Sequence, residues 1–246
     1  MDILRFEEAC ARVRNGERLI KGIGTKGEGS VHAVLKNYFE KDKQSQDMPI
    51  GRFIADIVGE DGIVEIQTSH FANLRDKLEA FLPVSRVTVV FPVYVNKDIV
   101  TMTHEGTVIA KRRSPLKGTA FDIFREIYPI ASFLTDSNLS IHIMMLECEE
   151  YRIRQETDSK RAKPHVSDRF PTKLVDEIRI DSPEDWEQLI PCLRKSEFTS
   201  TDLINIHHIS RKYASVALSV LHKGGILRRI GKGGNTFRYL YYKNTV

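Results

Sequence analysis

Two carboxylates on neighbouring segments of alternating sequence have the residue type and spacing to bind a metal ion. Asp56 lies near the end of the segment 50–58, and Glu65 lies in the segment 63–68, after a short turn at 60–62. If the two segments pair as a hairpin, both side chains can project from one face and converge. Two carboxylates and a backbone carbonyl make a hard-oxygen site suited to Mg²⁺, which can activate water and stabilise charge on a phosphate oxygen. The alternative is a pair of solvated surface carboxylates.

Residues of a predicted helix could contribute to the same edge. Glu28 comes just before this helix, and His32 lies one turn later. Residues three or four apart on a helix share one face, so they can act together. The alternative for His32 is an exposed or capping histidine. Lys36, on the same helix, is by default a solvated charge.

Periodicity predicts the elements that would position these side chains. Apolar residues at helical spacing predict helices over 29–39 and 71–82. Alternating residues predict strands over 50–58 and 63–68. The β-branched and aromatic run 87–93 is typical of a buried strand. The expected order is therefore helix, hairpin, helix, strand.

This part of the chain, from Glu28 to Pro92, resembles the PD-(D/E)xK nuclease superfamily. The resemblance rests on Asp56 and on Glu65-Ile66-Gln67 in the following strand, with a helix and a strand after them. It implies an α/β fold with a restriction-endonuclease-like αβββαβ core and a Mg²⁺-dependent endonuclease that acts on phosphodiester bonds. It also implies that Asp56 and Glu65 are the metal ligands, with Glu28 as an assisting acid.

The sequence departs from that superfamily at two positions. Ala55 stands where the motif has a proline, and Gln67 stands at the usual lysine. An E-x-Q element occurs among relatives of the superfamily, so Gln67 is compatible with activity, although it removes the cation that would polarise the water. Lys36 is the candidate for a migrated lysine. The alternative is a nuclease-like domain that has lost catalysis and serves a DNA-binding regulator.

The middle of the chain contains a basic segment and a polar one. Lys111, Arg112 and Arg113 begin a predicted basic loop that precedes an amphipathic helix, where charge and free N–H groups could bind phosphate. The alternative is a solvated loop. The polar stretch 156–165 indicates a linker. The pattern as far as Arg152 is similar to a bacterial family of uncharacterised proteins with a nuclease-like front.

The positive charge of the chain is concentrated in its C-terminal part. From Arg194 onward ten Lys and Arg residues stand against two acids, a net charge of +8, whereas the preceding residues carry 27 bases and 31 acids, a net charge of −4. A basic tail on an otherwise acidic chain indicates a polyanionic partner. A solvated basic surface is the alternative that charge alone leaves open.

Capping and turn signals predict the elements of this tail. Ser182 and Ser210 each stand where a helix N-cap is expected, and a second short helix is predicted after Phe198. Gly224-Gly225 ends the third helix, and two strands follow, joined by the glycine-rich turn 231–234. Three helices followed by a β-hairpin resemble the winged helix-turn-helix.

The resemblance to the winged helix-turn-helix covers residues 182–243 and implies DNA binding. In that family the third helix enters the major groove and the hairpin touches backbone or minor groove. The residues expected to face DNA are Arg211, Lys212 and Ser215 on the helix and Lys232 and Arg238 on the hairpin. The alternative is a module for protein contact or homodimer formation.

The whole sequence thus predicts two domains: a nuclease-like α/β domain over 1–155 and a winged helix-turn-helix over 182–246, joined by a linker segment over 156–181. Three widely spaced cysteines favour a reducing cytoplasm and argue against a structural zinc site. Without a long apolar run, no membrane partner is expected. The expected partner is DNA.

Overall fold

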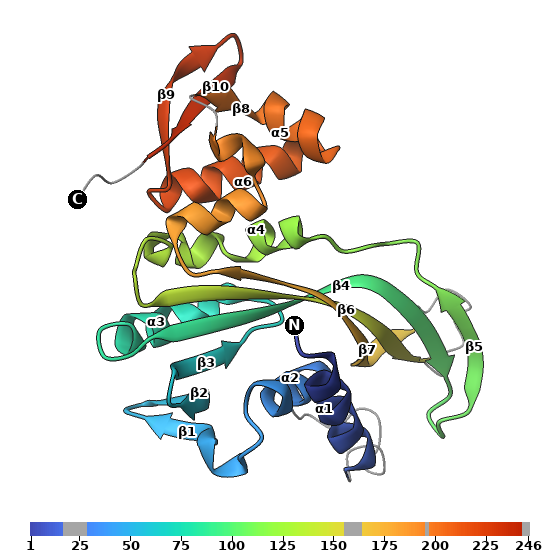
Figure 1. Ribbon diagram of the computed structural model, residues 1–246. Coiled ribbons are helices and arrows are strands. Elements are labelled where there is room, and N and C mark those ends of the chain that lie inside the picture. The colour runs from blue at the N-terminus through green and yellow to red at the C-terminus, as the bar shows by residue number, and fades with distance from the viewer. Residues whose placement is uncertain (17–28, 155–163, 195–196, 243–246) are drawn as a thin grey trace. The chain divides into compact units, whose positions relative to one another are not determined.

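The computed structural model describes residues 1–16, 29–154, 164–194 and 197–242 (Figure 1). The chain divides into two compact units, each built from three separate stretches. Unit 1 comprises 1–59, 92–119 and 144–177, and unit 2 comprises 60–91, 120–143 and 178–246. In the described part of the chain, no helix is long and apolar enough to cross a membrane.

A mixed sheet provides the framework of the chain. Its strands follow the order β1-β2-β3-β4-β6-β7, and β5 pairs with β4 away from this path. β1 and β2 are antiparallel, as are β4 and β5, whereas β3 and β4 are parallel. The bounds are β1 Gln46–Ile50, β2 Phe53–Gly59, β3 Gly62–Ile66, β4 Val87–Met102, β5 Val108–Arg113, β6 Leu139–Ile153 and β7 His165–Ile180.

Two packed helices begin unit 1. They are α1 (Ile3–Asn15) and α2 (Ser30–Phe39). The Asp2 side chain caps α1 by accepting a hydrogen bond from the Arg5 backbone N–H at 2.9 Å. The rings of Phe6 and Tyr38 meet edge to face, with centroids 5.8 Å apart, so each helix buries its apolar face partly against the other.

Short helices accompany the strands of unit 2. A 3-10 turn, η3 (Phe71–Leu74), leads into α3 (Arg75–Phe81), and a second group comprises η4 (Ala120–Asp122), α4 (Ile123–Glu126) and η5 (Tyr128–Phe133). Leu78, Ile123 and Ile130 are fully buried. The helix predicted over 71–82 is confirmed, with its first turn in 3-10 geometry.

The C-terminal elements, also in unit 2, form a small sheet with helices. The sheet has the order β8-β10-β9. The elements are η6 (Pro183–Gln188), η7 (Pro191–Arg194), β8 (Phe198–Thr199), α5 (Ser200–His207), α6 (Arg211–Lys223), β9 (Leu227–Gly233) and β10 (Thr236–Tyr241). The predicted second and third helices and the hairpin are confirmed, and β8 is an addition. The first helix is a 3-10 helix with the predicted Ser182 cap.

Two segments differ from their predicted structure. Lys111, Arg112 and Arg113 were expected in a loop but end strand β5, where they pair with β4 through a backbone ladder. Residues 165–180, expected within a linker, form strand β7. The first part of that linker, 156–163, lies outside the described residues.

Candidate nucleic-acid interface and the carboxylate strands

Helix α6 presents a basic face to solvent. Its N-cap, Ser210, accepts a hydrogen bond from the Tyr213 backbone N–H at 3.3 Å, as the capping pattern predicts. Ala214, Ala217, Leu218 and Leu221 form the buried stripe. Arg211, Lys212 and Ser215 are exposed on the opposite side, so all three helix residues predicted to contact DNA are accessible.

The β9–β10 hairpin combines cations with an exposed aromatic ring. Lys232 and Arg229 lie over the ring of Phe237, at 4.8 and 4.3 Å from its centroid. Arg238 is exposed and forms an ion pair with Glu197 at 3.3 Å, which partly compensates its charge. Gly234 at the tip has a φ of 61°, a left-handed conformation that suits glycine.

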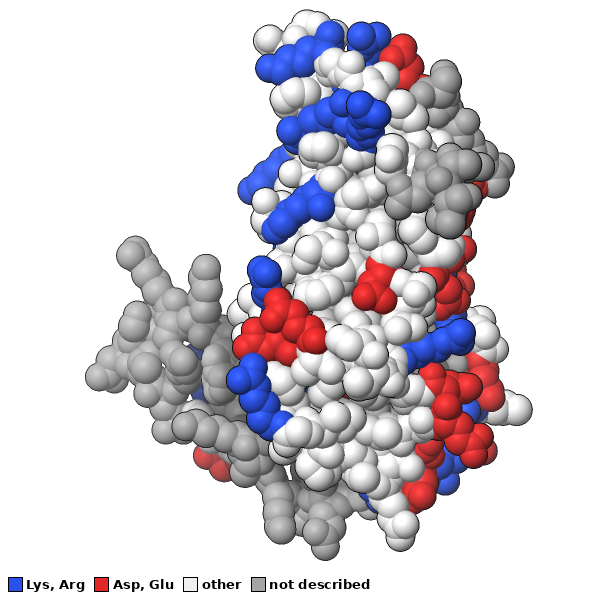
Figure 2. Space-filling view, turned by 90° about the vertical axis from the view of Figure 1, so that its left-hand side faces the viewer, with Lys and Arg blue, Asp and Glu red and all other residues white. Residues whose placement is uncertain are grey.

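We call the exposed cations of these elements together the tail surface. Figure 2 shows Lys and Arg side chains following one another along the part of the molecule formed by the C-terminal elements. The exposed members are Arg211, Lys212, Lys223, Arg228, Arg229, Lys232 and Arg238. Such a row of cations matches the spaced negative charges of a nucleic-acid backbone.

Helix α6 is also anchored within unit 2. The Tyr213 hydroxyl donates to Asp122 at 3.2 Å, and the Lys223 ammonium lies 3.9 Å from the centroid of the Tyr128 ring. The Trp186 ring packs against Phe124 with centroids 5.3 Å apart. The tail surface is therefore held in place by residues of α4 and its neighbouring turns.

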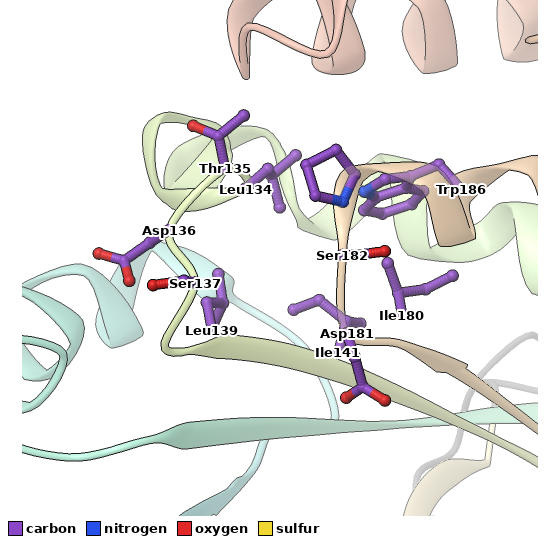
Figure 3. A pocket seen from close by; sticks show the side chains of 11 residues that line it. Leu134, Thr135, Asp136, Ser137, Leu139, Ile141, Ile180, Asp181, Ser182 and Trp186 are labelled. Atoms are coloured by element: carbon purple, nitrogen blue, oxygen red, sulfur yellow. The ribbon is translucent and has the colours of Figure 1, made fainter. Parts of the chain in front are cut away.

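A small cavity of 170 Å³ lies beside η6 in the same unit. In Figure 3 the side chains of Leu134, Ile180 and Trp186 surround the cavity, whereas the carboxylates of Asp136 and Asp181 point away from it. Hydrogen bonds from Ser140 and Arg179 outweigh the effect of burial and hold the pKa of Asp181 below its usual value. The cavity thus offers an apolar lining without an inward-facing catalytic group among its labelled residues.

In unit 1, Asp56 contacts a histidine. Its carboxylate lies 3.2 Å from His32 Nε2, and both side chains are partly exposed. His32 lies on α2 and Asp56 on β2, so the helix and strand predicted from the sequence do bring these two residues together. Glu28, the predicted assisting acid, lies outside the described residues.

In unit 2, Glu65 contacts a lysine that sequence analysis missed. The Glu65 side chain is 2% exposed and accepts a hydrogen bond from Lys77 of α3 at 2.7 Å. Lys36, the predicted migrated lysine, is buried and donates to Asp47 of unit 1 at 2.6 Å. Gln67 donates to the backbone carbonyls of Ser69 and His70, the latter at 3.4 Å. Lys77 could have been identified from the sequence, because it lies on the predicted helix 71–82 that follows the Glu65-Ile66-Gln67 segment.

The two carboxylates supply oxygen ligands of the kind that Mg²⁺ prefers. Within the ranges that the structure describes, however, no group of three or more His, Cys, Asp or Glu side chains lies together to hold a metal ion.

The basic residues of β5 are exposed but largely paired. Lys111 binds Glu149 at 2.7 Å, and Arg113 lies 3.6 Å from Asp98. Arg112 is exposed on the same strand. Because these pairs offset much of the charge, β5 is a weaker anion-binding surface than its sequence suggests.

Comparison with known proteins finds a family and a relative without an assigned activity. The family "Domain of unknown function (DUF8091)" matches residues 29–181. An uncharacterized protein of Treponema pallidum (strain Nichols) is 35% identical over 149 residues, which are 60% of this chain and 59% of the relative. The chain thus spans less than two thirds of that relative's length. No solved structure matches the chain.

Proposed function

The chain belongs to the DUF8091 family, and we propose that it is a DNA-binding protein whose C-terminal elements bind duplex DNA. The observation that carries the proposal is the tail surface, in which seven exposed cations lie on α6 and on the β9–β10 hairpin. The family match ends at residue 181, one residue before the Ser182 cap, so the DNA-binding part would be an addition to the family domain.

The order of the C-terminal elements supports a winged helix-turn-helix. Helical turns η6 and η7 come first, then β8, α5, α6 and the β9–β10 hairpin. In that arrangement α6 would enter the major groove with Arg211, Lys212 and Ser215, and the hairpin would contact phosphates through Lys232 and Arg238. Phosphate contacts of this kind position a protein on DNA without reading its sequence.

The salt dependence of binding provides a quantitative test. Each phosphate neutralised contributes about −0.9 to the slope of log K against log salt concentration. Replacing Arg211 and Lys212 together by Ala is therefore expected to reduce the magnitude of that slope by about 2 and to weaken binding at low salt. The measurement is fluorescence anisotropy of a labelled duplex, titrated at four salt concentrations.

A matched double variant, Lys117→Ala with Lys173→Ala, removes the same charge from exposed positions outside the tail. Its slope and affinity are expected to match those of the wild type. Equal effects of the two double variants would refute binding by α6. If the wild type binds no duplex, the alternative is favoured, in which the C-terminal elements serve protein contact or homodimer formation. Light scattering would then measure self-association.

A second candidate function is metal-dependent cleavage of DNA by the family domain. The order α2, β1, β2, β3, α3, β4 agrees with the αβββαβ core of the PD-(D/E)xK superfamily, and β2 and β3 are neighbours in the sheet. The candidate ligands Asp56 and Glu65 lie on these two strands. A Mg²⁺ ion bound there would supply an activated water and charge stabilisation. The catalytically inactive regulator is the alternative.

Cleavage is tested with Mg²⁺ or Mn²⁺ on duplex, single-stranded and branched DNA. Asp56→Asn and Glu65→Gln are each expected to abolish cleavage and keep DNA binding, whereas Asp61→Asn, in the exposed turn between β2 and β3, keeps both. Cleavage that persists in both variants would refute the assigned ligands. No cleavage and no Mg²⁺ binding by the wild type would favour the inactive regulator.

A further inference from the structure

A buried carboxylate in unit 1 is surrounded by three cations. Glu150 of β6 is 1% exposed. Lys97 of β4 lies 3.4 Å from its Oε2, and Arg169 of β7 donates to the same oxygen through Nε at 2.8 Å. Arg152 donates to Oε1 through Nε at 2.8 Å. Three neighbouring strands thus converge on one anion, and we call these four residues the Glu150 cluster.

The Glu150 cluster carries an excess of positive charge. Three cations stand against one carboxylate, which leaves a net charge of +2. Glu150 remains ionised because hydrogen bonds from Arg152 and Arg169 outweigh its burial and lower its pKa to about 2. Partly buried charges need compensation by an anion or by solvent. Glu149 of the same strand is already engaged by Lys111 at 2.7 Å.

The cations also retain donors for a further partner. Arg169 uses Nε for Glu150, and no other described residue accepts a hydrogen bond from its terminal nitrogens. Its side chain is 38% exposed, so these nitrogens are accessible to a solute. The Nη1 of Arg152 likewise has no acceptor among the described residues, and that side chain is 29% exposed.

An orphan hydroxyl lies on the same strand as Arg169. The Oγ of Ser167 is buried and has no hydrogen-bond partner in the part of the chain that the structure describes. Residues two apart on a strand share one face of the sheet, so Ser167 and Arg169 project from the same side of β7. Tyr94 of β4 supports Arg169, whose guanidinium lies 5.5 Å from the ring centroid.

We propose that the Glu150 cluster binds an oxyanion of the phosphoryl class, held by Lys97, Arg152 and Arg169. Guanidinium groups bind such anions through paired N–H donors, and an ammonium adds a point charge. Glu150 is a positioning residue in this site, because it accepts hydrogen bonds from Nε of both arginines and from Nη2 of Arg152. The terminal nitrogens of Arg169 and Nη1 of Arg152 are left to the ligand. The ligand is either free phosphate or a phosphate of a nucleic acid.

The first experiment measures binding of inorganic phosphate by calorimetry at constant ionic strength, with chloride as the balancing anion. Saturable binding with a Kd of about 1 mM or tighter is expected for the wild type. Arg152→Gln and Arg169→Gln are each expected to weaken it about tenfold. Lys111→Gln, which removes the same charge from the ion pair with Glu149, is the matched control and keeps the wild-type Kd.

Replacement of the central acid separates a binding site from a purely structural network. Glu150→Gln raises the net charge of the cluster from +2 to +3, so phosphate binding is expected to tighten severalfold in the folded variant. If the cluster were only a structural ion network, Glu150→Gln would not bind phosphate more tightly. Circular dichroism checks the fold, and if Glu150→Gln does not fold, the two arginine variants decide. No saturable phosphate binding by the wild type, or phosphate binding of wild-type strength by both arginine variants, would overturn the proposal.

The source of the phosphoryl group is assigned by competition in the Arg211→Ala, Lys212→Ala double variant, which weakens the tail surface. Displacement of phosphate by a short oligonucleotide would assign the site to nucleic acid. Binding of phosphate without displacement would assign it to free phosphate. The inference does not depend on DNA binding by α6, so either result leaves the test of the tail surface unaffected.

Discussion

The Glu150 carboxylate determines how the fold is expected to respond to acid. Hydrogen bonds from Arg152 and Arg169 outweigh burial and lower its pKa from 4.5 to about 2. A carboxylate with a lower pKa in the folded chain than in the unfolded chain stabilises the fold at pH values above its unfolded pKa. This stabilisation is lost as the pH falls through the folded pKa. At about 1.4 kcal/mol per pKa unit, the difference corresponds to about 3 kcal/mol.

The assay compares the wild type with Glu150→Gln, which cannot titrate. Urea unfolding, followed by circular dichroism, gives the free energy of unfolding of both proteins between about pH 7 and about pH 2. The advantage of the wild type is expected to stay constant down to about pH 5 and then to shrink by about 3 kcal/mol as the pH falls to about 2. The buried ion network also makes Glu150→Gln less stable than the wild type at neutral pH.

A control variant removes an exposed carboxylate in the same way. Glu79 pairs with Arg75 at 3.2 Å on the surface of α3, and both side chains are more than half exposed. Glu79→Gln is therefore expected to follow the wild-type curve closely. If the curves of the wild type and Glu150→Gln run parallel over the whole pH range, Glu150 does not have the depressed pKa, and the reasoning fails.

Three further substitutions test the packing of the C-terminal elements, each measured by thermal or urea unfolding. Trp186→Ala removes the ring that packs on Phe124 and is expected to cost about 3–5 kcal/mol; an unchanged midpoint would contradict that packing. Ser210→Ala removes the cap of α6 and is expected to cost about 1 kcal/mol, with Ser210→Gly recovering most of it. Gly224→Ala brings a Cβ to 2.8 Å from a backbone carbonyl and is expected to destabilise the fold, whereas Gly233→Ala, in open space, is expected to be neutral; equal effects would count against the close approach at Gly224.

Local patterns predicted the elements with strong periodicity. The helix over 29–39 and the strands β2 and β3 follow from apolar residues at spacings set by the backbone. Helix α6 follows from its Ser210 cap and buried stripe. These signals act over a few residues, so they can be read without knowledge of the tertiary fold.

Other strands carry no local signal. All six residues of β5 are exposed, so the strand forms through its backbone ladder with β4 and not through an alternating apolar face. β7 has polar residues on both faces and Pro171 near its centre, features that weaken a strand prediction. β8 has only two residues and depends on pairing with β10.

Which side chains contact the candidate site residues depends on the tertiary fold, and local sequence patterns do not show it. Asp56 was expected to converge with Glu65 and with His32, and the structure shows its contact with His32 of α2. Lys36 was expected near the carboxylates but is drawn to Asp47, whereas Lys77 reaches Glu65 from the next helix. Residue types suggested candidate acids, but the direction of each long side chain depends on the packing around it.

Trp186, Tyr213 and Lys223 lie outside the region that matches the family, but each contacts a residue inside it. The family match stops at residue 181, but these three residues pack on Phe124, Asp122 and Tyr128 within the matched region. The boundary of sequence similarity therefore falls within unit 2, one compact unit of the structure. A homologue that shares only residues 29–181 must cover the same aromatic face with a segment of its own, and hydrogen exchange in this chain should protect residues on both sides of the boundary together.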